Sequence, residues 1–338
     1  MVRRSYSTIE YLDHFYRTLS PSMTFRAKTK EEWAKWRRSL IDKLTELLGG
    51  FPDQRCDLEA EVSERIDEGD YIREKVVFQS EPTASVPAYL LIPKKTRFPG
   101  PTLICQHGHG RGKDDAAGIY TTEEELKQIR ELNYDYARQF AQRGYIVLAP
   151  DARCFGERND PREEYSGCNK AAMNSILMGK TLIGMRVWDI FRCIDYLETR
   201  EEVDPNRIGC MGLSGGGTVT FFSAILEKRI KAAVISGYFC TFKASIVDLP
   251  HCACNYVPNL LRYAEMPDLA CLIAPLPLLF ETGTQDPIFP TKAVQEAFEK
   301  VKQAYRLLGA EDRVDIDVFE GGHMFSGKKA FDWFERWL

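Results

Sequence analysis

Hydrophobic positions divide the chain into a helical beginning, a pair of extended segments and a long alternating region. Between residues 36 and 48, leucines recur at helical spacing, and Gly49-Gly50 with Pro52 ends that segment. The stretches YIREKVVF and VPAYLLIP follow, and they are typical of antiparallel strands at the edge of a sheet. We therefore expect a helical N-terminal extension over residues 1–55, followed by an α/β domain over residues 56–338.

Beyond residue 93, short apolar runs alternate with segments of helical character. The runs PTLICQHG, YIVLAPD, RIGCMGLS, IKAAVISGYF, LPLLFETGT and VDIDVFEGG resemble buried strands. Helices are expected over 122–143, 182–198, 216–226, 291–308 and 326–338. Strands that are apolar on both faces and separated by helices predict a mostly parallel sheet with helices on both faces.

Two stretches interrupt this rhythm, at about 152–180 and 240–272. Each is too long for a simple connection between a strand and a helix. We expect both to be insertions that fold over the ends of the strands, as a lid or as walls of a cleft.

Composition narrows the class of protein and its partners. The 45 basic and 49 acidic residues give a net charge of −4, which carries no signature of nucleic-acid or membrane binding. No apolar run follows the basic N-terminus, and LIAPLPLLF is too short to span a bilayer. The ten cysteines are scattered, so we expect reduced thiols in a cytoplasmic protein. The N-terminal helices could pack on the domain or form a homo-oligomer.

A nucleophile is predicted at Ser214. The sequence Gly212-Leu213-Ser214-Gly215-Gly216 fits the pattern G-x-S-x-G and lies between an apolar strand and a helix-forming run. A serine on so tight a strand-to-helix turn needs neighbours without a Cβ atom, and the turn leaves its hydroxyl exposed above the sheet. The motif alone is weak, but its flanking elements make it specific.

A base and an acid are predicted at the ends of two later strands. Only five histidines are present: His14, His107, His109, His251 and His323. His323 follows the last strand, so it should lie at the carboxyl edge of the sheet, where Ser214 also emerges. Asp286 directly follows LPLLFETGT, whereas its rivals Asp248 and Asp268 follow no strand. The order Ser, Asp, His is that of a hydrolase triad on this type of sheet.

The loop after PTLICQ is the candidate for stabilising an oxyanion. We expect one donor in the backbone N–H of Gly215 and the other in that of His109, with Gly108 allowing close approach. Substrate contacts are expected at His107, Gly108, Tyr238 and Phe239. Arg111, Lys113 and Arg153 border the loop, where structural ion pairs are favoured over binding of an acidic substrate.

Two motifs suggest a metal, and we interpret both as ordinary structure. His107 and His109 form a His-x-His pair with no evident third ligand. His251-Cys252-Ala253-Cys254 could be half of a zinc site, but no partner pair is visible in the sequence. We therefore expect no metal and no cofactor.

Taken together, these motifs resemble a known family. QHGHGRGKDD, APDARCFGER, GLSGGG, TGTQDPIFP and EGGH are similar to α/β-hydrolases of the dienelactone hydrolase and acetyl-xylan-esterase-like group, from about residue 60 to the end. The resemblance implies a Ser-His-Asp esterase that uses no cofactor, with its site at Ser214, Asp286 and His323. Two features depart from it. Dienelactone hydrolases proper use a cysteine nucleophile, and Leu276 stands where many relatives carry an arginine.

The sequence thus predicts a serine esterase for short acyl esters, including acetylated sugars. A serine peptidase resembling the prolyl oligopeptidases is an alternative, but such enzymes usually carry a large additional domain. A non-catalytic binding protein on a hydrolase fold is a second alternative, although such proteins typically lack a member of the triad. The natural substrate cannot be read from the sequence.

Overall fold

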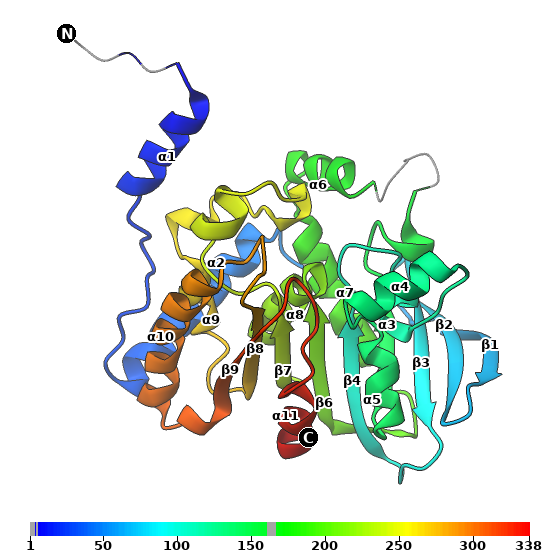
Figure 1. Ribbon diagram of the computed structural model, residues 1–338. Helices are drawn as coiled ribbons and strands as arrows, with labels where there is room; N and C mark the ends of the chain where they lie inside the picture. The colour runs from blue at the N-terminus through cyan, green and yellow to red at the C-terminus, as the bar shows by residue number, and fades with distance from the viewer. Residues whose placement is uncertain (1–3, 5, 161–166) are drawn as a thin grey trace.

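A nine-stranded sheet forms the centre of the molecule (Figure 1). The computed structural model describes residues 4, 6–160 and 167–338. The strand order is β1-β2-β3-β5-β4-β6-β7-β8-β9; the pairs from β1 through β3 to β5 are antiparallel, and those from β5 to β9 are parallel. The strands are β1 Glu61–Asp67, β2 Tyr71–Glu81, β3 Ala84–Pro93, β4 Gly100–Gln106, β5 Ile146–Pro150, β6 Val203–Leu213, β7 Ile230–Ser236, β8 Leu278–Gly283 and β9 Val314–Phe319.

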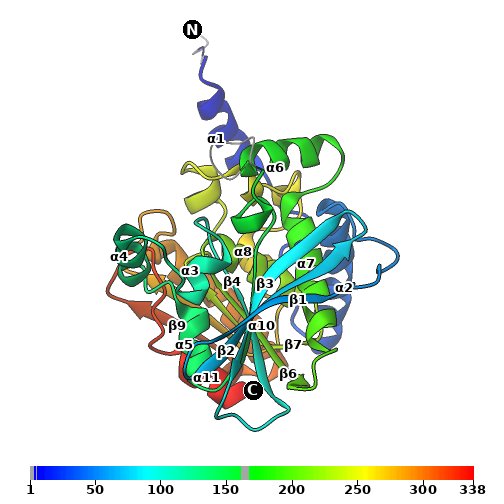
Figure 2. The ribbon, with the colours of Figure 1, turned by 90° about the vertical axis from the view of Figure 1, so that its right-hand side faces the viewer.

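Helices cover both faces of this sheet, as the alternating pattern predicted. Figure 2 sets α5 and α11 on one side of the strands and α2 and α7 on the other. The α-helices are α1 Thr8–Thr18, α2 Lys30–Leu47, α3 Lys113–Ala117, α4 Glu123–Glu131, α5 Tyr136–Gln142, α6 Cys168–Leu177, α7 Leu182–Leu197, α8 Gly215–Leu226, α9 Met266–Ala270, α10 Thr291–Leu308 and α11 Ala330–Trp337. The predicted mostly parallel sheet with helices on both faces is confirmed.

Apolar side chains from the strands divide between the two helical layers. On one face, Phe140 of α5 and Phe334 of α11 pack at 5.5 Å between ring centroids, and both are fully buried. On the other face, Leu40 and Leu44 of α2 are fully buried in the cluster that includes Phe222 of α8. Burial of this apolar surface is the main force that holds the helices on the sheet.

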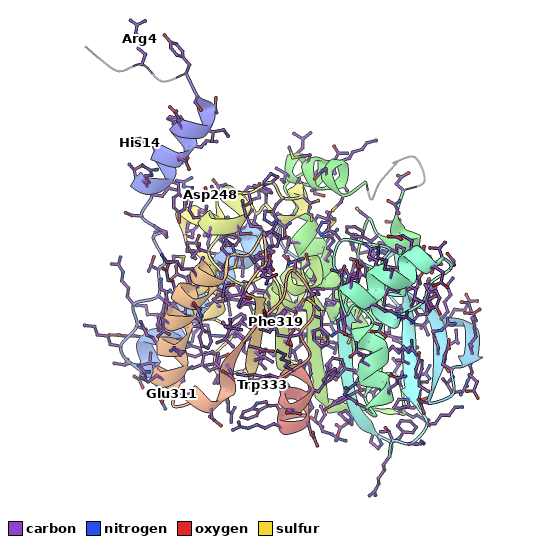
Figure 3. The ribbon with its side chains drawn as sticks, viewed as in Figure 1. Arg4, His14, Asp248, Glu311, Phe319 and Trp333 are labelled. Carbon is purple, nitrogen blue, oxygen red and sulfur yellow. The ribbon has the colours of Figure 1, made fainter. Side chains whose placement is uncertain are left out.

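The first two helices differ in their relation to this body. Helix α2 packs on it, whereas α1 projects outward and carries exposed Tyr11 and Phe15 (Figures 1 and 3). His14 lies on α1, away from the sheet (Figure 3). An ion pair between Asp13 and Lys243 (2.8 Å) connects α1 to the segment after β7. The boundary at residue 55, between the N-terminal extension and the α/β domain, stays a prediction.

The single helix expected over 122–143 is two helices in the structure. Helix α4 ends at Glu131, Asn133 has a φ of +49°, and α5 begins at Tyr136. The break positions Asn133, whose side chain donates to the carbonyl of Phe325, and Tyr134, whose hydroxyl accepts from the N–H of Gly108. Tertiary contacts at both side chains favour the break over a continuous helix.

The described parts of the two stretches predicted as insertions lie over the carboxyl ends of the parallel strands. Residues 240–272 contain a short π-helix, Lys243–Val247, and two short 3₁₀ turns, Ala253–Asn255 and Leu260–Arg262, before α9. The first stretch contains α6, which lies beside this segment at the top of Figure 1. Residues 161–166 of the first stretch lie outside the described residues. Among the described helices, none combines the length and the apolar character needed to cross a bilayer.

Candidate active site

Ser214 lies on a sharp turn between β6 and α8. Its φ of +58° and ψ of −119° fall in a region that L-residues rarely adopt. Two glycines permit this turn, because a Cβ on Gly216 would overlap the carbonyl of Gln106 and a Cβ on Gly212 would overlap Gly216. The N–H of Ser214 donates to the carbonyl of Ser236 in β7 (2.9 Å), which fixes the turn against the sheet.

His323 and Asp286 form a hydrogen-bonded pair at the same edge of the sheet. The Nδ1 atom of His323 lies 2.7 Å from Oδ2 of Asp286, whose side chain is almost completely buried. The other carboxylate oxygen of Asp286 accepts from the N–H groups of Ile288 and Phe289, both at 2.9 Å. This geometry places the proton on Nδ1 and leaves Nε2 as an acceptor. Among the described residues, Nε2 is buried and has no hydrogen-bond partner.

The two rival aspartates bond to other groups. Asp248 pairs with Lys243, and Asp268 accepts from the N–H of Phe25 (2.8 Å). Of the three aspartates, therefore, Asp286 is the one that contacts His323.

The loop after β4 lies against the turn at Ser214. A Cβ on Gly108 would lie 2.8 Å from the carbonyl of Leu213 and 3.1 Å from Cβ of Ser214, so the close approach requires glycine. The N–H of Gly108 is already used by the hydroxyl of Tyr134 (2.8 Å). Gly215 is the first residue of α8, so its N–H has no acceptor within the helix.

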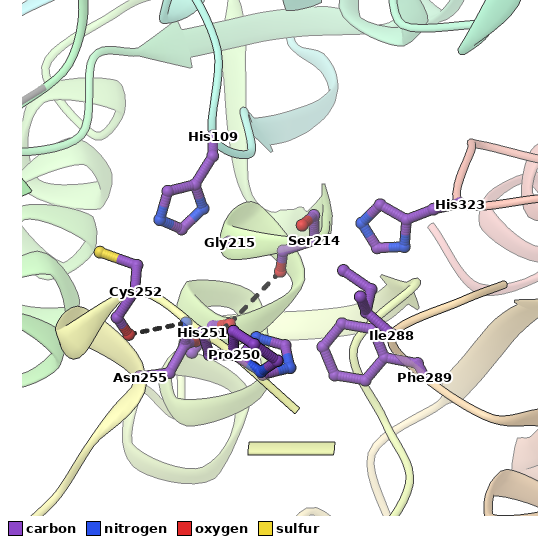
Figure 4. Close-up of a pocket in the computed structure, with 11 residues that line it drawn as sticks. His109, Ser214, Gly215, Pro250, His251, Cys252, Asn255, Ile288, Phe289 and His323 are labelled. Atoms are coloured by element: carbon purple, nitrogen blue, oxygen red, sulfur yellow. Dashed lines mark hydrogen bonds between the residues drawn. The ribbon is translucent and has the colours of Figure 1, made fainter. Parts of the chain in front are cut away.

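A pocket of about 290 Å³ opens beside Ser214. Figure 4 shows Ser214 between the rings of His109 and His323. The pocket is lined by His109, Ser214, Gly215, Thr218, Pro250, His251, Cys252, Asn255, Ile288, Phe289 and His323. The segment 250–255 and the loop at 288–289 thus supply walls that could not be assigned from sequence, because no pattern indicates how an irregular segment lies over the strands.

The residues predicted to contact substrate do not line this pocket. His107 is buried; its Nδ1 donates to the carbonyl of Gly108 (2.7 Å) and its Nε2 accepts from the N–H of Ala152 (2.9 Å). Tyr238 and Phe239 are buried in the core, where Phe239 stacks on Phe280 at 4.0 Å between centroids. His107, Gly108, Tyr238 and Phe239 are all absent from the lining of this pocket.

The three basic residues near the loop are in ion pairs. Arg111 pairs with Asp115 (2.7 Å) and Lys113 with Asp151 (3.0 Å). Arg153 pairs with Asp189 at 2.9 Å and with Glu81 at 2.5 Å. These contacts favour the structural interpretation of all three cations.

Burial favours the neutral form of two histidines near the site. Burial lowers the pKa of His107 against the opposing effect of Asp151. Burial, together with the neighbouring imidazoles of His109 and His323, lowers the pKa of His251. The Nε2 of His251 lies 2.9 Å from the hydroxyl of Ser245.

Cysteine and histidine side chains that are far apart in the sequence come together beside the pocket. Cys252 and Cys254 lie beside two partners that the sequence did not indicate, namely Cys168 and His109 of the His-x-His pair. His107, the other member of that pair, bonds elsewhere and is not part of the cluster. The structure places ligand atoms of four residues within 4.8 Å of one another: His109, Cys168, Cys252 and Cys254. The interpretation that the Cys-x-Cys pair has no partners is therefore wrong. Three separate segments contribute, so no sequence spacing could have shown the cluster.

Comparison with known proteins agrees with this architecture. Residues 2–326 match the sequence model of the Abhydrolase family. YtaP of Bacillus subtilis (strain 168), provisionally named a hydrolase, is 29% identical over 307 residues, which cover 88% of this chain and 98% of that protein. YitV of the same organism, provisionally named an esterase, is 25% identical over 234 residues, which cover 62% of this chain and 85% of that protein.

Solved structures share the fold at lower identity. A Bacteroides fragilis NCTC 9343 protein, provisionally named an acetyl xylan esterase, superimposes with a TM-score of 0.80 at 21% identity, covering 95% of this chain and 84% of that one. The glucuronoyl esterase from Solibacter usitatus superimposes with a TM-score of 0.71 at 16% identity, covering 94% of this chain and 96% of that one. The predicted α/β-hydrolase fold is thereby confirmed, and the names of the relatives support an enzyme of the esterase type.

Proposed function

The chain belongs to the Abhydrolase family, and from that premise we propose that it is a serine carboxylic-ester hydrolase acting on short acyl esters of the acetyl type. The observation that carries the proposal is the 2.7 Å bond between Asp286 and His323, beside the same pocket as Ser214. An imidazole held by a buried carboxylate is suited to accept the proton of a serine hydroxyl.

Each step of the proposed reaction uses side chains and backbone groups of this chain. The Oγ of Ser214 attacks the acyl carbon while Nε2 of His323 takes the hydroxyl proton. The C–O bond to the alcohol then breaks, and the imidazolium returns its proton to the leaving oxygen. Water, deprotonated by the same imidazole, attacks the acyl-enzyme and releases the acid. Asp286 holds the tautomer and stabilises the imidazolium.

Two backbone N–H groups are proposed to stabilise the tetrahedral oxyanion, those of Gly215 and His109. The N–H of Gly215 has no acceptor within α8, and that of Gly108 is bonded to Tyr134, which favours His109 as the donor from the other loop. Such donors typically contribute about 3 kcal/mol each to stabilisation of the transition state.

The size of the pocket supports a short acyl group. A volume of about 290 Å³ lies at the lower end of the range for small-molecule sites. Pro250, Ile288 and Phe289 supply apolar walls, while Thr218 and Asn255 supply polar groups. Because relatives by fold include proteins named as esterases of acetylated xylan, acetylated sugars are a candidate substrate class.

The decisive experiment replaces Ser214 by alanine and measures hydrolysis of p-nitrophenyl acetate. We expect kcat to fall on the order of 10⁴-fold or more, because the attacking oxygen is removed. A fluorophosphonate probe should label the wild-type protein at Ser214 and leave the variant unlabelled. Full activity of Ser214→Ala would refute the mechanism.

The role of the acid is tested separately with Asp286→Asn. An amide at this position favours the wrong imidazole tautomer, so kcat should fall on the order of 10⁴-fold while the protein stays folded. Circular dichroism and the melting temperature serve as the control for folding. Unchanged kcat in a folded variant would remove Asp286 from the proposed triad.

A further inference from the structure

Three cysteines and one histidine from distant parts of the chain converge beside the pocket. His109 comes from the loop after β4, and Cys168 begins α6. Cys252 directly precedes the short turn at Ala253–Asn255, and Cys254 lies within it. Their four ligand atoms lie within 4.8 Å of one another. The side chains of Cys168 and Cys254 are almost fully buried, and Cys252 is partly buried.

The spacing of these atoms suits a tetrahedral zinc ion. With Zn–S near 2.3 Å and Zn–N near 2.0–2.1 Å, an S-to-N edge of the tetrahedron is about 3.6 Å and an S-to-S edge is about 3.8 Å. The Sγ of Cys254 lies 3.4 Å from Nε2 of His109. The remaining pairs of ligand atoms lie no more than 4.8 Å apart.

We propose that these four side chains form a zinc site. Three thiolates and one imidazole are among the ligand sets that proteins use for structural zinc, and soft thiolates select Zn²⁺ over Mg²⁺ or Ca²⁺. All four positions of the tetrahedron are filled by the protein, so the ion has no open position for water or substrate. The site is therefore structural, and each thiol releases its proton to solvent when the metal binds.

The surroundings of the cluster complement a zinc–thiolate centre. One Zn²⁺ with three thiolates has a net charge of −1, and the buried guanidinium of Arg186 donates to Cys168 (3.2 Å). The same group also donates to the carbonyl of Arg153 (2.8 Å), which holds it in place. The side chain of Asn169 accepts from the N–H of Ala253 (2.8 Å), which holds the Cys-x-Cys turn against α6. Such outer contacts commonly orient the ligands of a metal.

The proposed zinc site would hold two residues of the pocket wall, His109 and Cys252, in place. It connects both long segments over the sheet, 152–180 and 240–272, to the loop that carries His109. The Nε2 of His109 faces the thiols, whereas its Nδ1 faces Gly215, since a Cβ on Gly215 would lie 2.9 Å from that atom. A metal on Nε2 therefore fixes this ring beside the turn at Ser214, and it fixes the pocket wall at Cys252 as well.

Metal analysis of the full-length protein, purified under reducing conditions and reconstituted with Zn²⁺, tests the proposal. We expect one zinc per chain by plasma mass spectrometry, and for the Co²⁺-substituted protein the absorption typical of tetrahedral thiolate coordination. Cys168→Ser and Cys254→Ser should lose the bound zinc. The matched control is Cys56→Ser, whose thiol lies outside the cluster and which should keep it.

Two further readouts separate this proposal from the proposed function. Ser214→Ala should retain one zinc per chain, because the nucleophile is not a ligand. Chelation of the metal should lower the melting temperature of wild-type protein and leave that of Cys168→Ser unchanged. Wild-type protein that binds no zinc after reconstitution under reducing conditions would overturn the site.

Discussion

A buried carboxylate in strand β8 should make the stability of this protein depend on pH. Glu281 is 2% exposed, and one of its oxygens accepts from the N–H of Gly327 (3.1 Å). Among the described residues, its other oxygen has no hydrogen-bond partner. Burial raises the pKa of Glu281 from its ordinary 4.5 to about 7.

The sign and size of the effect follow from this shift. An acid whose pKa is raised on folding contributes stability below pH 4.5, and that contribution is lost as pH rises through about 7. At about 1.4 kcal/mol per pH unit, the folded protein loses roughly 3 kcal/mol over this interval, of which about 2–3 kcal/mol falls between pH 5 and pH 8. Glu281→Gln removes the titrating group, so its free energy of unfolding should rise relative to that of wild type by about 2–3 kcal/mol between pH 5 and pH 8.

The assay is urea denaturation of both proteins at pH 5 and pH 8, with reversibility verified at each pH. A difference in the free energy of unfolding between variant and wild type that is constant with pH would reflect the fit of the amide. The readout is therefore the change of that difference between pH 5 and pH 8. Glu201→Gln is the matched control, because Glu201 is exposed and its replacement should not alter the pH dependence. If the free energy of unfolding of Glu281→Gln differs from that of wild type by the same amount at both pH values, the raised pKa of Glu281 is refuted.

Two further predictions concern the turn at Ser214 and the pocket beside it. Gly216→Ala should destabilise the protein by about 3 kcal/mol in denaturation experiments, because its Cβ would overlap the carbonyl of Gln106. Gly322→Ala, with open space around its Cβ, should leave stability nearly unchanged; equal stability of the two variants would contradict this account. Ile288→Ala should raise the ratio of kcat/KM for butanoyl over acetyl esters by about tenfold, since it enlarges the pocket. An unchanged ratio would remove Ile288 from the acyl site.

The sheet and the convergence of Ser214, Asp286 and His323 at one edge could be predicted from sequence because each follows an apolar strand. In a parallel sheet the carboxyl ends of the strands meet at one edge, so chain order is enough to bring such residues together. The alternation of apolar strands with helices likewise predicted the α/β class. The limits of α10 could be predicted because its helical periodicity is regular over its whole length.

Features built by irregular segments could not be predicted in this way. The pocket walls at His251 and Asn255 and the cluster around Cys168 depend on how two long connections fold over the sheet, and no periodic pattern encodes that arrangement. The break at Asn133 was missed for a related reason. No glycine or proline marks it, and it is favoured by contacts with loops that are distant in sequence.

The short connection between α4 and α5 touches both rims of the proposed active site. Tyr134 holds Gly108 on the loop that carries His109, while the carbonyl of Leu132 accepts from the N–H of Phe325, two residues beyond His323. Displacement of either rim would break hydrogen bonds to the same few residues, so we expect movements of the two rims to depend on one another through this connection. A substitution at this connection would then reach both ends of the proposed catalytic arrangement, although neither the proposed nucleophile nor the proposed base lies near it in the sequence.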